Sequence, residues 1–295
     1  SGSTLAIPSC DTVTAEIVRK DFTVRRYRRS DGSQYWQCTW VWKSPEAAQR
    51  AARCKPAVYQ AQFDQFPPAV HKLWRAELQL WQDWGFIREV QREDLRSSIT
   101  LILIAQPHKT STPVRPVFDF KPVNAGLVSY PNETGHITCG ATLRRRRPGY
   151  SDEGRLTESW VLMDIKKAYM CIHMHPTCSV YQGITLVDDD GTRTYWELTR
   201  LAFGVSIAPK VLRAGIDFIL VEAGIDGGVE PYFDDLRVPK SQLDQVVTAL
   251  NQNGFSLKDP EEAETARILG LQRAAGNVWT RRSPLGPIQG STYHH

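Results

Sequence analysis

The chain has 295 residues, of which 41% are hydrophobic, so it is long enough to form one large domain or two small ones around a sizeable core. The formal net charge of +4 permits a polyanionic partner without requiring one. No apolar run approaches the roughly 18 residues of a membrane span, and no signal peptide is visible. We therefore expect an intracellular protein with no membrane contact.

The six cysteines are scattered, and none forms a Cys-x-x-Cys pair or stands at zinc-finger spacing from a histidine. In a chain of this length, such usage is typical of reduced, buried thiols in an intracellular protein. A metal cluster of Cys171, Cys178, His173 and His175 is an alternative. An amphipathic strand explains the alternation of these residues better.

The N-terminal segment, residues 1–67, is expected to form an extension made of a hairpin and a helix. Strand-forming aromatic and β-branched residues flank a turn signal at 31–33 and predict a β-hairpin over 22–42. Ser44 followed by Pro45 predicts a helix with Ser44 as its N-cap and an end near Arg53. The extension either packs on the next domain near the substrate or has a purely structural role.

Pro68 begins a longer predicted helix that Gly85 ends. Tryptophans can stack on nucleic-acid bases, but at helical spacing they indicate a core face. The residues expected on that face are Val70, Leu73, Trp74, Leu78, Trp81 and Trp84. Strands over 98–105 and 114–120 then predict a β-hairpin with Lys109 near its tip and Arg115 on its returning strand.

Residues 124–159 have the composition of a long loop, and this loop contains a run of four arginines, Arg144, Arg145, Arg146 and Arg147. Neighbouring like charges repel one another unless water or phosphate groups compensate them. The run is therefore either a solvated basic loop or a contact with a template or primer backbone.

Three acidic residues carry the strongest chemical signal. Asp164 lies in the apolar run 160–165, the pattern of a buried strand, where a carboxylate must be paired or bind a metal ion. Asp234 and Asp235 stand between two β-prone runs and predict a hairpin turn. If the two stretches are neighbouring strands, the three carboxylates converge and can hold two divalent cations about 3.5–4 Å apart. The alternatives are a buried Asp164 held by an arginine or by backbone N–H groups, and an ordinary solvated turn.

The remaining pattern predicts strands at 169–175, 181–186 and 193–198, with a turn over 188–191. A helix beginning between Ser206 and Pro209 follows Gly204, whose bare main chain would let a base or sugar approach closely. Ser241 is the predicted N-cap of another helix, which Gly254 ends, and a last hairpin covers 268–282. Inward-facing residues of the two helices are Val211, Leu212, Ile216, Ile219 and Leu220, and Leu243, Val246, Val247 and Leu250.

The acidic residues belong to an ordered set of six motifs that resembles the reverse transcriptases. Asp164–Tyr169 is similar to the first palm motif, and Tyr232–Asp235 to the Tyr-x-Asp-Asp box. The other four similar segments are Arg115–Asp119 (fingers), Phe203–Pro209 (Phe-Gly-x-x-x-Ala-Pro), Gly254–Lys258 and Ile268–Leu271 (later palm motifs). Together they cover about residues 74–279, and within the family they are most similar to LTR retrotransposons of the BEL/Pao kind.

The resemblance implies an α+β fold of the right-hand polymerase type, in which an antiparallel palm sheet is backed by helices. It implies mostly fingers in residues 68–160, palm with part of the fingers in 161–282, and a tail in 283–295. A thumb and an RNase H would then belong to the rest of a polyprotein. Whether this chain is active without them is left open by the sequence.

The implied reaction is templated DNA synthesis, in which a primer 3′ hydroxyl attacks the α-phosphate of a deoxynucleoside triphosphate. Asp164, Asp234 and Asp235 would hold two Mg²⁺ ions, with Mn²⁺ as a substitute. Implied nucleotide-binding residues are Lys109, Arg115, Tyr169, Gly204, Pro209 and Lys258, the last beside the leaving pyrophosphate. The implied contacts with an RNA or DNA template and its primer are Arg144, Arg145, Arg146, Arg147, Leu269 and Gly270.

Three rival interpretations accompany this one. A polymerase that copies RNA into RNA shares the same palm, but the bulky ring of Tyr169 would exclude a 2′ hydroxyl. A non-catalytic descendant would only bind nucleic acid or another protein, and the three intact acids argue against it. The third rival is an unrelated structural protein. A reverse transcriptase of this kind would be cytoplasmic, in a virus-like particle, or nuclear.

Overall fold

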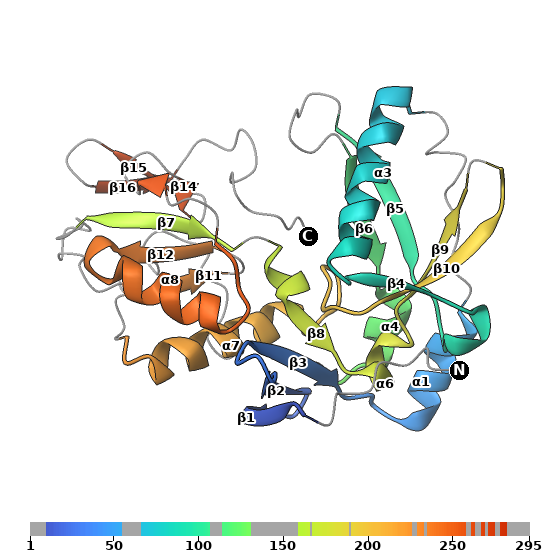
Figure 1. Cartoon of the computed structure of the whole chain (residues 1–295), viewed down its shortest axis with the longest axis horizontal. Coiled ribbons are helices and arrows are strands. Elements are labelled where there is room, and N and C mark those ends of the chain that lie inside the picture. Colours follow the sequence, from blue (N-terminus) through green and yellow to red (C-terminus); the bar gives the residue numbers. More distant parts are fainter. Residues whose placement is uncertain are drawn as a thin grey trace. The chain divides into compact units, whose positions relative to one another are not determined.

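The computed structural model shows a mixed α+β protein, as the sequence predicted, and the strand pairs whose register it defines are antiparallel (Figure 1). It describes residues 10–54, 66–106, 114–130, 159–165, 167–188, 190–225, 229–232, 235–257, 261–262, 267–268, 271–274 and 278–281. None of the helices in these ranges combines the length and apolar character needed to cross a bilayer.

The chain forms two compact units, and each is assembled from segments that are far apart in sequence. The first unit takes residues 1–25, 37–129 and 172–208, and the second takes 26–36, 130–171 and 209–295. The N-terminal segment therefore contributes to both units, because the chain passes from one to the other within strands β2 (Phe22–Arg28) and β3 (Gln34–Trp40).

The predicted N-terminal hairpin is confirmed. Strands β2 and β3 are neighbours in a four-stranded sheet with the order β1-β2-β3-β8, which also contains β1 (Thr12–Val18) and β8 (Ile172–Met174). At the turn, the Asp31 carboxylate accepts a hydrogen bond from the Ser33 backbone N–H at 2.9 Å, and Gly32 has φ +88°. Only glycine adopts that backbone conformation without steric cost.

The first helix, α1 (Pro45–Arg53), also has the predicted start and end. The Ser44 hydroxyl oxygen accepts a hydrogen bond from the Ala47 N–H at 3.1 Å, and Pro45 occupies the first helical position. Such a cap satisfies a backbone donor that the helix itself leaves open.

Helix α3 (Pro68–Asp83) begins at the predicted proline, but its buried face is narrower than expected. Val70, Trp74 and Trp81 are buried, whereas Leu73 is 49% exposed and Trp84 is 50% exposed. With 3.6 residues per turn, Leu73 and Trp84 stand beside the stripe of the other three rather than within it. The expectation of a core role for all three tryptophans is therefore wrong for Trp84.

Two further β structures belong to the first unit. Strands β5 (Thr100–Ala105) and β6 (Val114–Asp119) form the predicted hairpin, paired from Thr100–Asp119 to Ala105–Val114. Strands β4 (Ile87–Val90), β10 (Arg193–Leu198) and β9 (Gly183–Val187) form a sheet in that order. Short helical segments connect these strands: η1 (Arg92–Asp94), α4 (Lys121–Gly126) and α6 (Pro176–Ser179).

Helix α4 corrects one expectation, since Asn124 was predicted to begin a loop and lies inside this helix.

The turn between β9 and β10 is as predicted. The Asp188 N–H donates to the Thr192 carbonyl at 2.8 Å, and Gly191 has φ +86°. Asp189 of this turn lies outside the described residues.

The second unit is built on a four-stranded sheet with the order β11-β12-β7-β13. Its strands are β11 (Glu230–Tyr232), β12 (Asp235–Pro239), β7 (Trp160–Asp164) and β13 (Glu261–Glu262). Helix α8 (Leu243–Gln252) packs on β12 (Figure 1). The five residues predicted to face inward on α7 (Ala208–Glu222) are all buried.

Three predictions for the second unit need correction. Ser241 does not cap α8, because a 3-10 turn, η3 (Lys240–Gln242), comes first and Gln242 occupies the cap position. Leu243 and Val247 are partly exposed, while Val246 and Leu250 are buried. The strand expected from Tyr169 begins only at Ile172, because a 3-10 turn, η2 (Ala168–Cys171), precedes it.

The predicted C-terminal hairpin is present as β15 (Leu271–Ala274) and β16 (Val278–Arg281), with Ala274 opposite Val278. Its expected first strand is divided, since Ile268 belongs to a separate strand, β14 (Arg267–Ile268), that pairs with β15.

The described cysteines are free thiols, as expected. Of these, Cys38 and Cys178 are buried as predicted, whereas Cys10 and Cys54 are exposed.

Candidate functional site

The candidate site lies where strands β7 and β12 meet. Asp164 is the last residue of β7, Asp235 is the first residue of β12, and the antiparallel register places them directly opposite one another. Directly opposed residues of such a pair have their Cα atoms about 4.5–5.5 Å apart. The predicted convergence of these two segments is therefore confirmed at the level of the backbone.

The third acid belongs to the connection between β11 and β12. Tyr232 is opposite Asp235 in the register of this hairpin, so Phe233 and Asp234 are the two residues that join the strands. A two-residue connection is the tightest common form of β-hairpin. Asp234 itself lies outside the described residues.

Apolar residues surround this acid on both faces of β7, since all five residues of the strand are buried. Along β7 and the residue after it, Val161, Met163 and Ile165 are buried and share one face with the equally buried Leu236 and Val238 of β12. Asp164 belongs to the opposite face and is only 9% exposed. A carboxylate this far from water is costly unless a cation or hydrogen-bond donors stabilise its charge.

The donor chemistry of this site fits a hard divalent cation, since Mg²⁺ is bound in proteins through carboxylate oxygens. Asp164 is opposite Asp235 in register, and Asp234 is adjacent in sequence. Within the residues whose side chains are described, no group of three or more His, Cys, Asp or Glu could hold a metal ion. Asp234 and the Asp235 side chain are not among those residues.

The alternative cluster of Cys171, His173, His175 and Cys178 lies among the described residues, and no group of three or more such side chains close enough to hold a metal ion was found there. The His175 ring nitrogen Nδ1 accepts a hydrogen bond from the Thr177 backbone N–H at 3.2 Å. Burial raises the pKa of the Cys178 thiol to about 11, so without a bound metal ion this cysteine is protonated at neutral pH.

Tyr169 belongs to η2, five residues after Asp164, and is 1% exposed. Its ring is thus packed inside the second unit. Lys167, two residues earlier, has φ +45°, a conformation that is uncommon for a residue other than glycine. The chain therefore leaves β7 through a sharp bend before it reaches Tyr169.

The structure gives a reason for glycine at position 204 that the sequence motif did not reveal. Its φ is +104°, and a side chain there would place Cβ 2.9 Å from the Phe118 carbonyl oxygen of β6. The Asn124 side chain braces the same turn, because its Nδ2 donates to the Gly204 carbonyl at 2.7 Å and its Oδ1 accepts from the Ser206 N–H at 2.8 Å. Sequence reasoning missed Asn124, for which only its place after the fingers-like motif was a signal.

The other predicted site residues are divided between the units. Arg115 lies on β6, opposite Ile104, in the first unit, as does Gly204. Asp164, Tyr169, Asp235 and Pro209, the second residue of α7, belong to the second unit. The predicted residues outside the described part of the chain are Lys109, Arg144, Arg145, Arg146, Arg147, Asp234, Lys258, Leu269 and Gly270.

A buried arginine beside the acid pair was also missed. Arg237 of β12 is 1% exposed, and its guanidinium carbon lies 4.1 Å from the ring centroid of Trp160, which is equally buried. The signal was available in the sequence, since Arg237 interrupts the apolar run between Leu236 and Val238 directly after the two aspartates.

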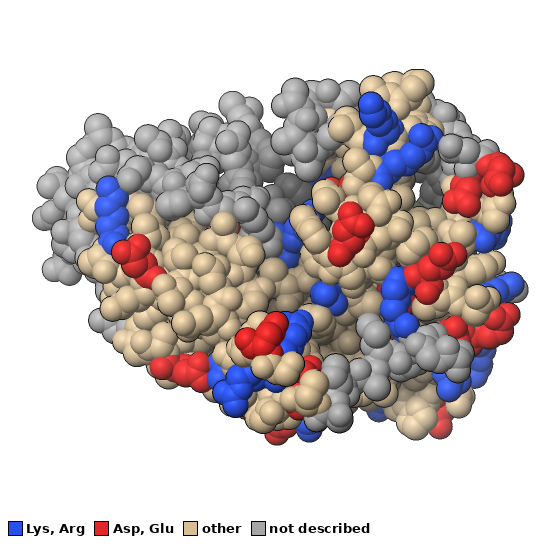
Figure 2. All heavy atoms as spheres, viewed as in Figure 1, with Lys and Arg blue, Asp and Glu red and all other residues tan. Residues whose placement is uncertain are grey.

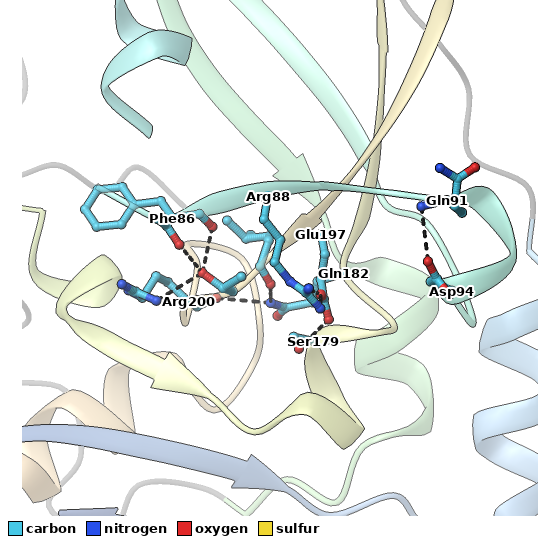
Figure 3. Close-up of polar contacts among 11 residues, drawn as sticks. Phe86, Arg88, Gln91, Asp94, Ser179, Gln182, Glu197 and Arg200 are labelled. Atoms are coloured by element: carbon cyan, nitrogen blue, oxygen red, sulfur yellow. Dashed lines mark hydrogen bonds and ion pairs between the residues drawn. The ribbon is translucent and has the colours of Figure 1, made fainter. Parts of the chain in front are cut away.

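A second buried carboxylate, Glu197 on β10, shows what a structural acid looks like in this protein (Figure 3). It is 2% exposed, and its Oε2 accepts a hydrogen bond from Arg88 Nε at 2.9 Å while its Oε1 accepts one from the Ser179 hydroxyl at 2.8 Å. The nearby Gln182 side chain donates to the carbonyls of Leu198 and Arg200 at 2.9 and 3.0 Å. These contacts join β4, β10 and α6 without involving the predicted site.

On the face of the molecule seen in Figure 2, basic and acidic side chains lie next to one another over the described residues. The described part of this face therefore carries no broad patch of a single sign.

A scan against models of known protein families found no match, and no curated protein matched the chain. Function has to be inferred from the motifs and from the acid pair.

Proposed function

We propose that this chain is the fingers and palm part of a reverse transcriptase, the RNA-directed DNA polymerase of an LTR retrotransposon of the BEL/Pao kind. The observation that carries the proposal is the register that sets Asp164 opposite Asp235, with Asp234 in the two-residue connection of the adjoining hairpin. The six motifs in the order of the family support it independently.

In this proposal, the second unit supplies the palm, and its sheet carries the catalytic acids. Asp164 and Asp234 hold two Mg²⁺ ions, with Mn²⁺ as a substitute, and Asp235 supports them from the opposing strand. When bound, such a metal pair lowers the pKa of the attacking hydroxyl and neutralises the charge that develops on the phosphates. The protein contributes position and charge rather than covalent chemistry.

The remaining proposed roles concern substrate binding. Lys109 and Arg115 hold the triphosphate of a deoxynucleotide, since arginine grips phosphate oxygens through two donors and lysine acts as a point charge. Tyr169, Gly204 and Pro209 are proposed nucleotide contacts, with the Tyr169 ring under the sugar, and Lys258 stabilises the departing pyrophosphate. The template and primer, of RNA or DNA, contact Arg144, Arg145, Arg146, Arg147, Leu269 and Gly270.

The partners of this proposal are a primed template and deoxynucleotides. The thumb and RNase H come from the rest of a polyprotein, and the working location is a cytoplasmic virus-like particle or the nucleus. A non-catalytic descendant is the alternative function, and it would bind nucleic acid without incorporating nucleotides.

Replacement of either Asp164 or Asp234 by Asn should abolish primer extension while the protein stays folded, because each change removes one anionic ligand and keeps the side-chain shape. The assay extends a labelled DNA primer on RNA and on DNA templates, with Mg²⁺ or Mn²⁺. Circular dichroism checks the fold of each variant.

Asp217→Asn is the matched control, since this exposed acid forms an ion pair with Arg213 of the same helix at 3.0 Å, and it should leave extension unchanged. Wild-type activity in D164N or D234N would refute the assignment of the acids. Template binding by the wild-type chain without any incorporation would favour the non-catalytic alternative.

A further inference from the structure

Arg237 occupies a defined place on the face of the sheet that carries the acid pair. It is opposite Leu162 in the register of β12 and β7, and Trp160 and Asp164 are the residues two positions to either side of Leu162. Because residues two apart on a strand share a face, Arg237, Trp160 and Asp164 lie on the same one. The arginine thus stands diagonally across from the buried aspartate and two residues beyond Asp235.

The contact with Trp160 holds the guanidinium at this place. A distance of 4.1 Å from the guanidinium carbon to the ring centroid is well inside the range of a cation–π interaction. Both side chains are 1% exposed, so rotation of the arginine away from the face would break a packed contact. Arginine keeps its charge at any pH that a protein tolerates, and the site therefore contains a permanent buried cation.

Arg26, another deeply buried arginine among the described residues of the second unit, shows a common way to stabilise such a charge. Arg26 is 5% exposed and donates to both carboxylate oxygens of Glu222 at 2.7 Å each, and to Asn253 Oδ1 at 3.0 Å. Arg237 is placed by register on the face of the sheet that carries Asp164, two residues from Asp235 along β12. Two other acids share its row of the sheet by register, Glu230 opposite it on β11 and Glu261 opposite Leu162 on β13.

We propose that Arg237, held by Trp160, is a positioning residue that acts as the fixed cation of the acid pair. Its charge offsets the repulsion between Asp164 and Asp235, so β7 and β12 stay paired with both acids opposed before any metal ion binds. It also weakens the attraction of the site for a divalent cation, which permits release of the ions with the product. This inference rests on the proposed metal site.

Arg237→Met tests the idea, because methionine keeps an unbranched apolar stem against Trp160 and removes the charge. The melting temperature of R237M should fall below that of the wild type in EDTA, and saturating Mg²⁺ should restore most of the loss. Adding Asp235→Asn should restore it in EDTA as well, since the repulsion is then removed. A ligand that stabilises the variant more must also bind it more tightly.

Mn²⁺ titration measures that affinity directly. R237M should bind Mn²⁺ about five- to tenfold more tightly than the wild type, the effect expected of one fixed charge on a divalent ion about 7–8 Å away with water-like screening. Arg213→Met, which removes a partly exposed charge on α7, should change neither the affinity nor the response to Mg²⁺.

Equal destabilisation of R237M with and without Mg²⁺, and no relief from D235N, would overturn the proposal and leave Arg237 as a core residue. Relief from Glu230→Gln or Glu261→Gln instead of D235N would assign its charge to those acids and would equally overturn it. If R237M does not fold, the double variant D235N/R237M decides, because it folds only if repulsion was the cause. If the wild type binds no Mn²⁺, the proposed metal site fails, while the comparison in EDTA still tests the charge offset.

Discussion

Tyr169 is the single residue on which sugar selection would depend in the proposed enzyme. Its burial means that truncation of the ring costs stability whatever its function, on the order of 3–5 kcal/mol for a large aromatic side chain. Loss of stability alone therefore does not distinguish a nucleotide floor from a core position. The two roles differ in what they do to the choice between ribonucleotides and deoxynucleotides.

We expect Tyr169→Ala to retain some deoxynucleotide incorporation and to raise ribonucleotide incorporation markedly, because the space beneath the sugar is opened to a 2′ hydroxyl. The measurement is the ratio of the two incorporation rates, taken beside the melting temperature. Tyr169→Phe keeps the ring and should preserve the ratio. A lower melting temperature in Tyr169→Ala with an unchanged ratio would identify Tyr169 as a core residue only.

At the level of elements, a partly buried ion pair connects strand β2 to helix α7 within the second unit. Arg26 is buried over the rings of Trp36 and Phe218, at 5.5 and 5.7 Å from their centroids, and binds both carboxylate oxygens of Glu222. These hydrogen bonds from Arg26 lower the pKa of Glu222 below its ordinary value. The folded state therefore favours the ionised carboxylate.

The sign of the resulting pH dependence follows from that lowered pKa. The contribution of Glu222 to stability is fully present above the unfolded-state pKa, about 4.3, and is lost as the pH falls through the lower folded-state pKa. We expect the wild type to be more stable than Glu222→Gln at pH 7 and the difference to shrink steadily below about pH 4. Urea unfolding at both pH values measures it, and a difference that does not change with pH would contradict the prediction.

Local sequence signals located most of the elements, because caps and turns depend on a few adjacent residues. Ser44 caps α1, Gly32 and Gly191 take positive φ in their turns, and the β5–β6 hairpin pairs as expected. These signals failed where burial or a helix start depends on residues that are distant in the sequence. Leu73 and Trp84 fit a helical stripe but are half exposed, and Ser241 is displaced from its cap by the turn that follows β12.

For the whole molecule, each compact unit is assembled from segments that the sequence separates widely. Such an arrangement depends on contacts that no window of neighbouring residues contains. The basic run at 144–147 lies outside the described residues. Its proposed contact with phosphates is therefore tested by its effect on nucleic-acid binding.

Changing Arg144, Arg145, Arg146 and Arg147 together to Ala should weaken nucleic-acid binding and its dependence on salt. The slope of log binding constant against log salt concentration should become shallower by roughly one unit for each lost phosphate contact. Fluorescence anisotropy over a series of salt concentrations gives the slope. The control replaces four exposed arginines elsewhere, Arg19, Arg28, Arg75 and Arg92, and should alter the slope less. An unchanged slope in the first variant would leave the run as a solvated loop.

The sequence by itself predicted the hairpins and the cap of α1, since turn and cap chemistry are local properties, and the motif resemblance predicted the α+β class. Only the tertiary structure decided that Asp164 is opposite Asp235 and that Arg237 lies on the same face over Trp160. The physical reason is the register of β7 against β12. A shift of one residue would turn every side chain of a strand to the other face, so the register that sets Met163 opposite Leu236 is also the one that sets Asp164 opposite Asp235.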